Sequence, residues 1–173
     1  MLVDVDDSLP TNDRLWAGCY VEPMHDHVTV ERLTEITAAD SAAIAALLPQ
    51  LSTTATFDPT RLDQLVARED IEMFVARVDG QLVGMATLVT FPLPTGWRGL
   101  VEDVVVDAEA RGAGIARLLL EALTSAADRL RLRTLDLTSR GSREAALRLY
   151  ESVGFVRRDT NVMRYSPVSD RYR

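Results

Sequence analysis

The sequence predicts an α+β domain whose mixed, mostly antiparallel central sheet is flanked by helices. Two observations support this class. Several short segments have apolar residues at every second position, and the dipeptide Asp79-Gly80 joins two of them as a tight hairpin turn. The segment 100–106 then runs through a glycine-rich turn into an amphipathic helix, and one further strand and helix follow. This order of elements describes one domain with both helices and a sheet.

Composition and charge exclude several classes of protein. The chain has 173 residues, which suits a single domain, and 19 basic against 26 acidic residues give a net charge of −7. This balance argues against nucleic-acid binding, because no basic stripe is available for phosphates. Cys19 is the only cysteine, so no intrachain disulfide can form. The acidic N-terminus does not resemble a secretory signal, and no apolar run reaches membrane-spanning length. We therefore expect a cytoplasmic protein.

The chain divides into three parts by periodicity. Residues 1–27 have no clear period and are interpreted as an N-terminal extension, residues 28–166 as the folded domain, and residues 167–173 as a tail. The extension contains Cys19, His25 and His27, but no further metal ligand follows at a recognisable spacing. We expect no metal site.

The first half of the domain begins with a strand at 28–33. Thr37 and Asp40 form a variant capping box that opens a helix, and Asp58-Pro59 is the start signal of a second helix. A loop at 52–57 lies between them.

The second half contains the hairpin strands 73–78 and 81–91, a loop at 92–97 rich in proline and glycine, and the strand 100–106. A helix is predicted from Ile115 to about Arg129, and a strand from Thr134 to Thr138. Ser142 is the expected N-cap of the last helix and Gly154 its end. Two closing strands are predicted at 155–158 and 161–165.

The strand–turn–helix at 100–123 is the principal candidate site, because its unpaired backbone N–H groups and helix dipole favour an anion. A P-loop requires a lysine, which the sequence lacks, and a dinucleotide fingerprint requires a small residue where Arg117 stands. The remaining pattern is R-x-x-G-x-A from Arg111 to Ala116. A glycine-rich turn without a ligand is the structural alternative.

This pattern resembles the acyl-CoA pyrophosphate arm of the GNAT-type N-acetyltransferases. A second landmark of that family is a leucine–tyrosine pair followed by glycine–phenylalanine, which here is Leu149-Tyr150 and Gly154-Phe155. Together the two motifs extend the resemblance over 28–165. It implies a GNAT-like fold and acetyl-CoA as cosubstrate. By this resemblance the cofactor contacts would be Val104, Val105 and Val106 on the strand, Arg111, Gly112, Ala113, Gly114, Ile115 and Ala116 in the turn, and Ser139 and Arg143 near the last helix.

The resemblance also implies two catalytic residues. Tyr150 would protonate the departing thiolate, and Glu102 would act as general base. Strict alternation places Glu102 on one face with Val104 and Val106, and Asp103 on the other, but a bulge would change this facing. Glu102, Asp103 and a water therefore all stay open as the base, with Glu102 favoured.

The implied activity is direct transfer of the acetyl group from acetyl-CoA to a primary amine of a small molecule or peptide. A ping-pong route through Cys19 is not expected, because that thiol lies in the N-terminal extension. The alternative is a non-catalytic acyl-CoA-binding regulatory module. The acceptor amine cannot be read from the sequence. No nucleic acid or membrane is expected as a partner, and a homodimer stays open.

Overall fold

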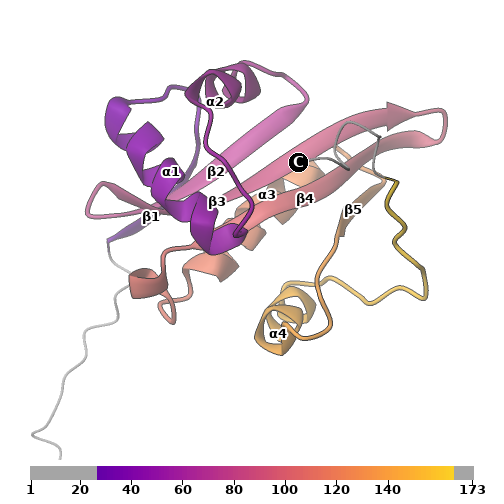
Figure 1. The fold of residues 1–173 in the computed structure, drawn as a ribbon. Coiled ribbons are helices and arrows are strands. Elements are labelled where there is room, and N and C mark those ends of the chain that lie inside the picture. Colours follow the sequence, from indigo (N-terminus) through magenta and orange to yellow (C-terminus); the bar gives the residue numbers. More distant parts are fainter. Residues whose placement is uncertain (1–26, 166–173) are drawn as a thin grey trace, which may run out of the picture.

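The computed structural model describes residues 27–165 as a central sheet with helices on both faces (Figure 1). The elements are β1 (Val28–Arg32), α1 (Ala38–Leu51), α2 (Pro59–Val66), β2 (Ile71–Val78), β3 (Gln81–Leu93), β4 (Gly96–Val106), a 3₁₀ turn (Ala108–Ala110), α3 (Ile115–Arg129), β5 (Thr134–Leu137) and α4 (Glu144–Ser152).

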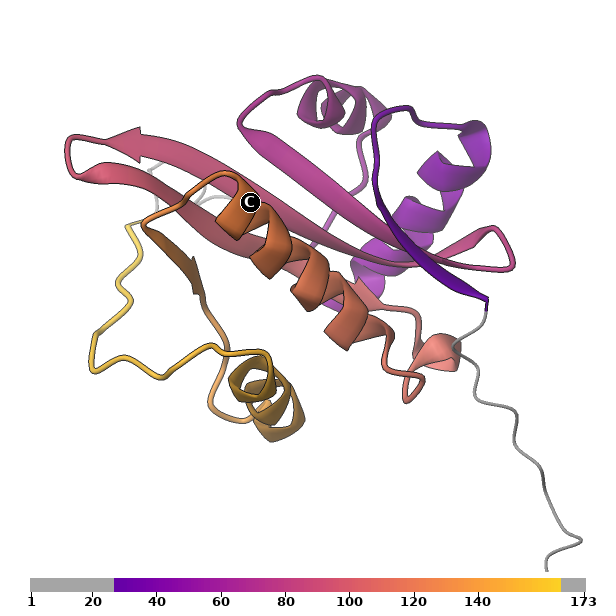
Figure 2. The same ribbon diagram turned by 180° about the vertical axis from the view of Figure 1, so that it is seen from behind.

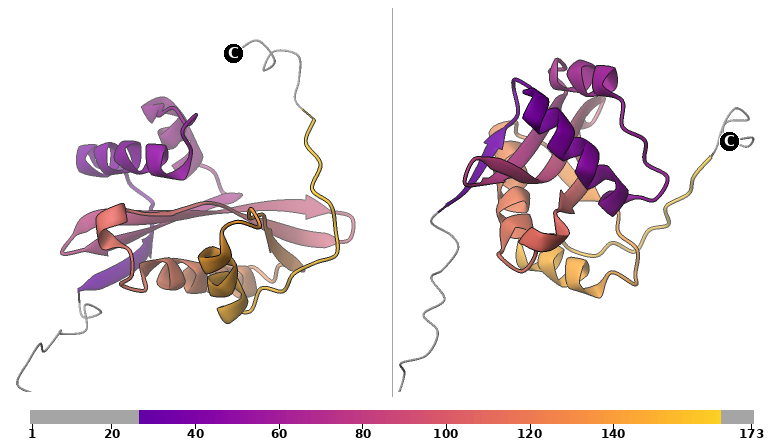
Figure 3. Two further views of the ribbon diagram at one scale, coloured as in Figure 1. Left: turned by 60° about the horizontal axis from the view of Figure 1, so that its bottom comes forward. Right: turned by 60° about the vertical axis from the view of Figure 1, so that its left-hand side comes forward.

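The sheet has five strands in sequence order, β1-β2-β3-β4-β5. Neighbouring strands are antiparallel except β4 and β5, which are parallel and are connected through α3. Helices α1 and α2 lie on one face and α3 and α4 on the other, as the edge-on view in Figure 3 shows. The predicted α+β class with a mixed, mostly antiparallel sheet is confirmed.

Two apolar clusters form the core, one on each face of the sheet. The first lies under α3, which crosses the sheet in Figure 2, and includes the fully buried Leu119, Leu120 and Leu123. The second lies under α1 and α2 and includes Ile44 and Leu47. β4 contributes side chains to both clusters, and it leads through the 3₁₀ turn into the glycine-rich turn.

The N-terminus of α1 has the predicted capping box and an additional buried ion pair. Thr37 Oγ1 accepts a hydrogen bond from the backbone N–H of Asp40 (3.1 Å), and Asp40 Oδ2 accepts from the N–H of Thr37 (3.1 Å). The other carboxylate oxygen of Asp40 accepts from the Arg77 guanidinium at 2.6 Å. Asp40 thus links α1 to β2, and the Arg77 guanidinium holds its pKa below the usual range.

Replacing Asp40 by alanine should therefore lower the free energy of unfolding by about 3 kcal/mol at neutral pH, because it removes the capping bonds and leaves the partly buried Arg77 with only the exposed Glu31 as an ion-pair partner. Since the pKa of Asp40 is lowered in the folded state, its contribution is present above the unfolded pKa of about 3.9 and is lost as pH falls through the folded value. Urea unfolding at pH 7 and pH 3 should show the deficit shrinking in acid. Asp63→Ala on the exposed surface of α2 is the control, and an equal deficit in both variants would contradict the prediction.

Three predicted features differ from the structure. The loop expected at 92–97 is the end of a long hairpin in which Pro92 pairs with Trp97 and Leu93 with Gly96. Proline is tolerated there because β2 pairs with β3 only as far as Val89, so the strand has one neighbour. The N-cap of α4 is Arg143 rather than Ser142, and it makes no side-chain cap.

The third difference concerns the two closing strands. Residues 155–158 and 161–165 form no strand in the structure. They run along the side of the molecule as an extended segment, in which Val162 and Met163 are largely exposed. A strand requires a partner for its backbone groups, and alternation in the sequence does not supply one.

Most of the predicted N-terminal extension and the 167–173 tail lie outside the described residues, as do Cys19 and His25. Of the helices that the structure describes, none is long and apolar enough to cross a membrane.

Candidate active site

The second half of β4 leaves the sheet open on one side. The parallel pairing of β4 with β5 covers only 98–101, so residues 102–106 have β3 as their only paired strand in the sheet. An unpaired strand edge presents backbone N–H and C=O groups that an extended ligand can bind. The structure therefore has an open backbone edge immediately before the glycine-rich turn.

A β-bulge shifts the side chains of β4 at the same point. Met85 pairs with Val105 and Thr87 pairs with Glu102, so β4 carries one extra residue in this interval. As a result Val101 and Val106 both pack in the cluster under α3, whereas Val105 packs in the cluster under α1 and α2. Strict alternation of side chains therefore does not hold along this part of β4, because the bulge interrupts it.

The glycine-rich turn has the backbone conformation that its sequence favours. Gly112 (φ 85°) and Gly114 (φ 76°) both lie in the left-handed region, which a side chain disfavours. Gly114 is the N-cap of α3 and its carbonyl accepts from the N–H groups of Arg117 and Leu118. Within residues 27–165, the N–H groups from Gly112 to Ala116 have no hydrogen-bond acceptor. These donors and the helix dipole together make a site suited to an anion.

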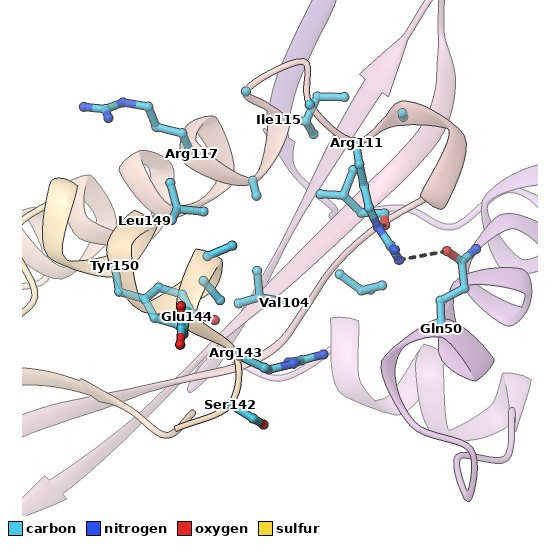
Figure 4. Close-up of a pocket in the computed structure, with 18 residues that line it drawn as sticks. Gln50, Val104, Arg111, Ile115, Arg117, Ser142, Arg143, Glu144, Leu149 and Tyr150 are labelled. Atoms are coloured by element: carbon cyan, nitrogen blue, oxygen red, sulfur yellow. Dashed lines mark hydrogen bonds between the residues drawn. The ribbon is translucent and has the colours of Figure 1, made fainter. Parts of the chain in front are cut away.

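A cavity of about 700 Å³ joins the turn to the open edge of β4 and to the N-terminal half of α4 (Figure 4). Its lining is supplied by four different parts of the chain. The residues are Gln50 from α1; Val104, Val105 and Val106 from β4; Ala110, Arg111, Gly112, Gly114, Ile115, Ala116 and Arg117 from the turn and α3; and Ser142, Arg143, Glu144, Ala145, Ala146, Leu149 and Tyr150.

Arginines give the cavity a positive character. Arg111 and Arg143 extend into the space between α1 and α4, whereas the guanidinium of Arg117 points away from it (Figure 4). Arg117 is held by Glu121 at 2.8 Å and by Ser152 on α4 at 3.2 Å, and so it links the two helices. Arg111 Nε donates to the carbonyl of Val106 at 3.1 Å, which holds this side chain against the end of β4.

Tyr150 lies on the face of α4 that packs toward the sheet. Its ring contacts Phe155 edge to face, with ring centroids 6.3 Å apart. Burial raises the pKa of the Tyr150 phenol, and the nearby Arg143 offsets part of this rise. The phenol therefore keeps its proton at neutral pH, as a proton donor must.

Two carboxylates occupy the bulge. Burial raises the pKa of Glu102, the adjacent Asp103 carboxylate raises it further, and Arg164 lowers it. Partial burial of its carboxyl also raises the pKa of Asp103, although much of that residue's surface is exposed. Asp103 has a positive φ of 53°, which is unusual for a residue other than glycine. The bulge thus holds two carboxylates whose charged forms are disfavoured.

Most of the predicted cofactor residues meet in the cavity, but three of the named site residues do not line it. Ala113 and Glu102 lie outside the lining. Ser139 lies at a second cavity of about 950 Å³ beside β5, where its buried hydroxyl has no hydrogen-bond partner among residues 27–165. Tyr150 lines both cavities, and a contact between Ser139 and the cosubstrate stays a prediction.

Several residues of the cavity lining are not among the predicted site residues, and two of them, Gln50 and Arg117, have polar contacts of their own. Gln50 comes from α1, 57 residues before its partner Asp107, and nothing in its local sequence indicates this contact. Arg117 was noted only as the residue that breaks a dinucleotide fingerprint. Among the described residues, no group of three or more histidines, cysteines or carboxylates is arranged to hold a metal ion.

The fold and the site together define an acetyltransferase-type domain. The chain belongs to the acetyltransferase (GNAT) family, whose model matches residues 41–155. Both sequence motifs lie within this range or at its end, so the resemblance inferred from them is confirmed at the level of the family.

Individual relatives agree with this assignment. A mycothiol acetyltransferase of Thermomonospora curvata is 41% identical over 96 residues, which is 55% of this chain but only 31% of that protein. A ribosomal-protein-alanine N-acetyltransferase of Brucella melitensis biovar Abortus 2308 is 28% identical, with a TM-score of 0.63 over 80% of this chain and 99% of that one. An aminoglycoside N-acetyltransferase solved with CoA shares the fold at 14% identity, with a TM-score of 0.68 over 81% of this chain and 95% of that one.

Proposed function

We propose that this protein is an N-acetyltransferase that transfers the acetyl group of acetyl-CoA directly to a primary amine. One observation carries the proposal: the glycine-rich turn with its free N–H groups at Gly112 and 114–116, the open edge of β4 and Tyr150 all border one cavity in the described part of the chain. A cosubstrate with an anionic pyrophosphate, an amide-containing arm and a thioester requires these three features in this order.

The binding step uses backbone groups more than side chains. The N–H groups of the turn would hold the pyrophosphate, and Arg111 and Arg143 would add positive charge beside it. Val104 to Val106 would bind the pantetheine arm through the open strand edge, as an added strand would. The thioester would then lie near Tyr150.

The chemical step requires a free amine, a polarised carbonyl and a protonated leaving group. The amine attacks the thioester carbonyl carbon, and backbone N–H groups of β4 stabilise the oxyanion that forms. The carbon–sulfur bond then breaks, and Tyr150 gives its proton to the departing sulfur. A carboxylate in the bulge, or a water beside it, removes the surplus proton from the amine and releases it to solvent, and solvent returns a proton to the Tyr150 phenolate. Products are the N-acetylated amine and CoA.

Glu102→Gln should remove the acidic limb of the pH–rate profile. A general base must be ionised, and because the pKa of Glu102 is raised, activity should fall as pH drops through that raised value. Asp103→Asn should move the same limb to lower pH, because removing the neighbouring negative charge lowers the pKa of Glu102. The measurement is kcat/KM for a fixed amine between pH 5 and pH 9.

Asp103→Asn also serves as the matched comparison, because it alters a carboxylate of the same bulge without removing Glu102. We expect it to lower the maximal rate less than Glu102→Gln. If the acidic limb of the pH–rate profile is unchanged in Glu102→Gln, the base is Asp103 or a water and not Glu102.

The acceptor is proposed to be a small-molecule or peptide amine. The relatives are described as acting on mycothiol, aminoglycosides or ribosomal-protein alanine, and these share only an amine as acceptor. The deciding experiment is a panel of amines assayed for CoA release with acetyl-CoA. If no amine of the panel causes CoA release although the protein binds CoA tightly, the non-catalytic acyl-CoA-binding module would be favoured.

A cytoplasmic location and a homodimer stay predictions. Sedimentation velocity of the full chain measures the second, and a single species at the mass of one chain would contradict it.

A further inference from the structure

One glutamine lies between two charged groups at the mouth of the cavity. Gln50 Oε1 accepts a hydrogen bond from Arg111 NH2 (3.2 Å) and another from the backbone N–H of Ala108 (2.9 Å). Gln50 Nε2 donates to Asp107 Oδ2 at 3.0 Å. A single side chain from α1 therefore contacts both ends of the segment 107–111, as Figure 4 shows for Arg111.

Asp107 and Arg111 are close enough to interact electrostatically. The pKa of the Asp107 carboxyl is lowered chiefly by the backbone N–H of Glu109, then by Gln50, and also by the positive charge of Arg111. Asp107 is therefore ionised at neutral pH. Within residues 27–165 the two groups form no direct ion pair, and each is hydrogen-bonded to Gln50 instead.

The amide of Gln50 satisfies each group without neutralising either. Its oxygen accepts from the cation and its NH₂ group donates to the anion, an arrangement that a carboxylate or an ammonium could not provide. Arg111 keeps its full positive charge beside the unpaired N–H groups of the turn. A direct pair with Asp107 would cancel that charge for an incoming anion.

We infer that Gln50 is a positioning residue, which keeps Arg111 apart from Asp107 so that the guanidinium charge stays available for the pyrophosphate of acetyl-CoA. This inference rests on the proposed function for the identity of the anion. The separation of Arg111 from Asp107 is independent of that identity and can be measured without the cosubstrate.

The first test measures Asp107 itself in the free protein. If Gln50 is only a hydrogen-bond donor to Asp107, Gln50→Leu should raise the pKa of that carboxyl, because a stabilising bond is lost. If Gln50 is a spacer, Arg111 replaces it as the direct partner, and the pKa should fall further. Titration of the carboxyl carbon by NMR distinguishes the two directions. A raised pKa would overturn the inference whatever the protein binds.

The second test measures CoA binding by calorimetry. Gln50→Leu should weaken CoA binding by about tenfold and raise the KM for acetyl-CoA with little change in kcat. Adding Asp107→Asn should recover most of the affinity, because the competing carboxylate is gone while an amide oxygen still accepts from Glu109 N–H. Gln50→Glu should also weaken binding at neutral pH, because its carboxylate would pair with Arg111.

Gln64→Leu, the same substitution on the exposed surface of α2, is the control and should bind CoA like the wild type. Unchanged affinity in Gln50→Leu, or no recovery in the double variant, would overturn the inference. A third outcome separates the two proposals: the wild type binds no CoA, but the pKa of Asp107 falls in Gln50→Leu. This result would refute the proposed function and support the role of Gln50 in keeping Arg111 apart from Asp107.

Discussion

Gly114→Glu should abolish measurable CoA binding. Gly114 is the N-cap of α3, and the N–H groups on either side of it have no acceptor in the described part of the chain. A glutamate there would place a side chain in the space that a phosphate needs and a negative charge beside it. We expect a loss of affinity of at least about 100-fold, which is about 2.7 kcal/mol. Isothermal titration with CoA measures it.

The control must separate this effect from backbone strain, because Gly114 has a positive φ that glutamate adopts at a cost. Gly80→Glu introduces the same residue at nearly the same φ (79°) in the β2–β3 hairpin turn, away from the cavity. Both variants should lose similar stability, and only Gly114→Glu should lose CoA. Equal CoA affinity in the two variants would mean that the pyrophosphate does not bind at this turn.

Tyr150→Phe should lower turnover by about 100-fold while leaving CoA affinity and thermal stability nearly unchanged. The substitution keeps the ring and its edge-to-face contact with Phe155, and removes only the hydroxyl. Because burial raises the pKa of Tyr150, the wild-type phenol is protonated throughout the neutral range and can donate to the leaving sulfur. The measurements are kcat with a fixed amine, CoA affinity and the thermal midpoint.

Tyr165→Phe is the matched control, since it removes a phenol hydroxyl from a side chain that is 78% exposed. We expect it to change neither rate nor stability. If Tyr150 is only a packing residue, its loss should instead appear as about 1 kcal/mol of stability with little change in rate. That outcome would mean that the thiolate departs without a general acid, because of its own low basicity.

Local signals in the sequence were sufficient wherever neighbouring residues decide the conformation. The capping box at Thr37, the N-cap Asp58 and the start of α3 at Ile115 were all predicted, because each depends on hydrogen bonds or periodicity within one turn. The same is true of the hairpin turn at Asp79-Gly80 and of the glycine-rich turn. The family resemblance rested on such local patterns.

Pairing between distant segments decided the remainder. The bulge in β4 depends on its register against β3. Because of the bulge, Val101 lies on the same face of the sheet as Val106 and not on that of Val105. The hairpin can extend through Pro92 because β2 pairs with β3 only as far as Val89. The proline pattern alone does not indicate where that pairing ends. The alternating pattern at 155–165 did not become strands, because no backbone partner meets it in the described structure.

The sequence by itself determined the class of fold, the glycine-rich turn before α3 and the family, because strand and helix periods and the glycine pattern are properties of consecutive residues. Only the tertiary structure decided that β4 parts from β5 after Val101, that Ser139 lies outside the cavity, and that Gln50 is hydrogen-bonded to both Arg111 and Asp107. These contacts join segments tens of residues apart, and their geometry follows from the packing of α1, β4 and α4 around one another.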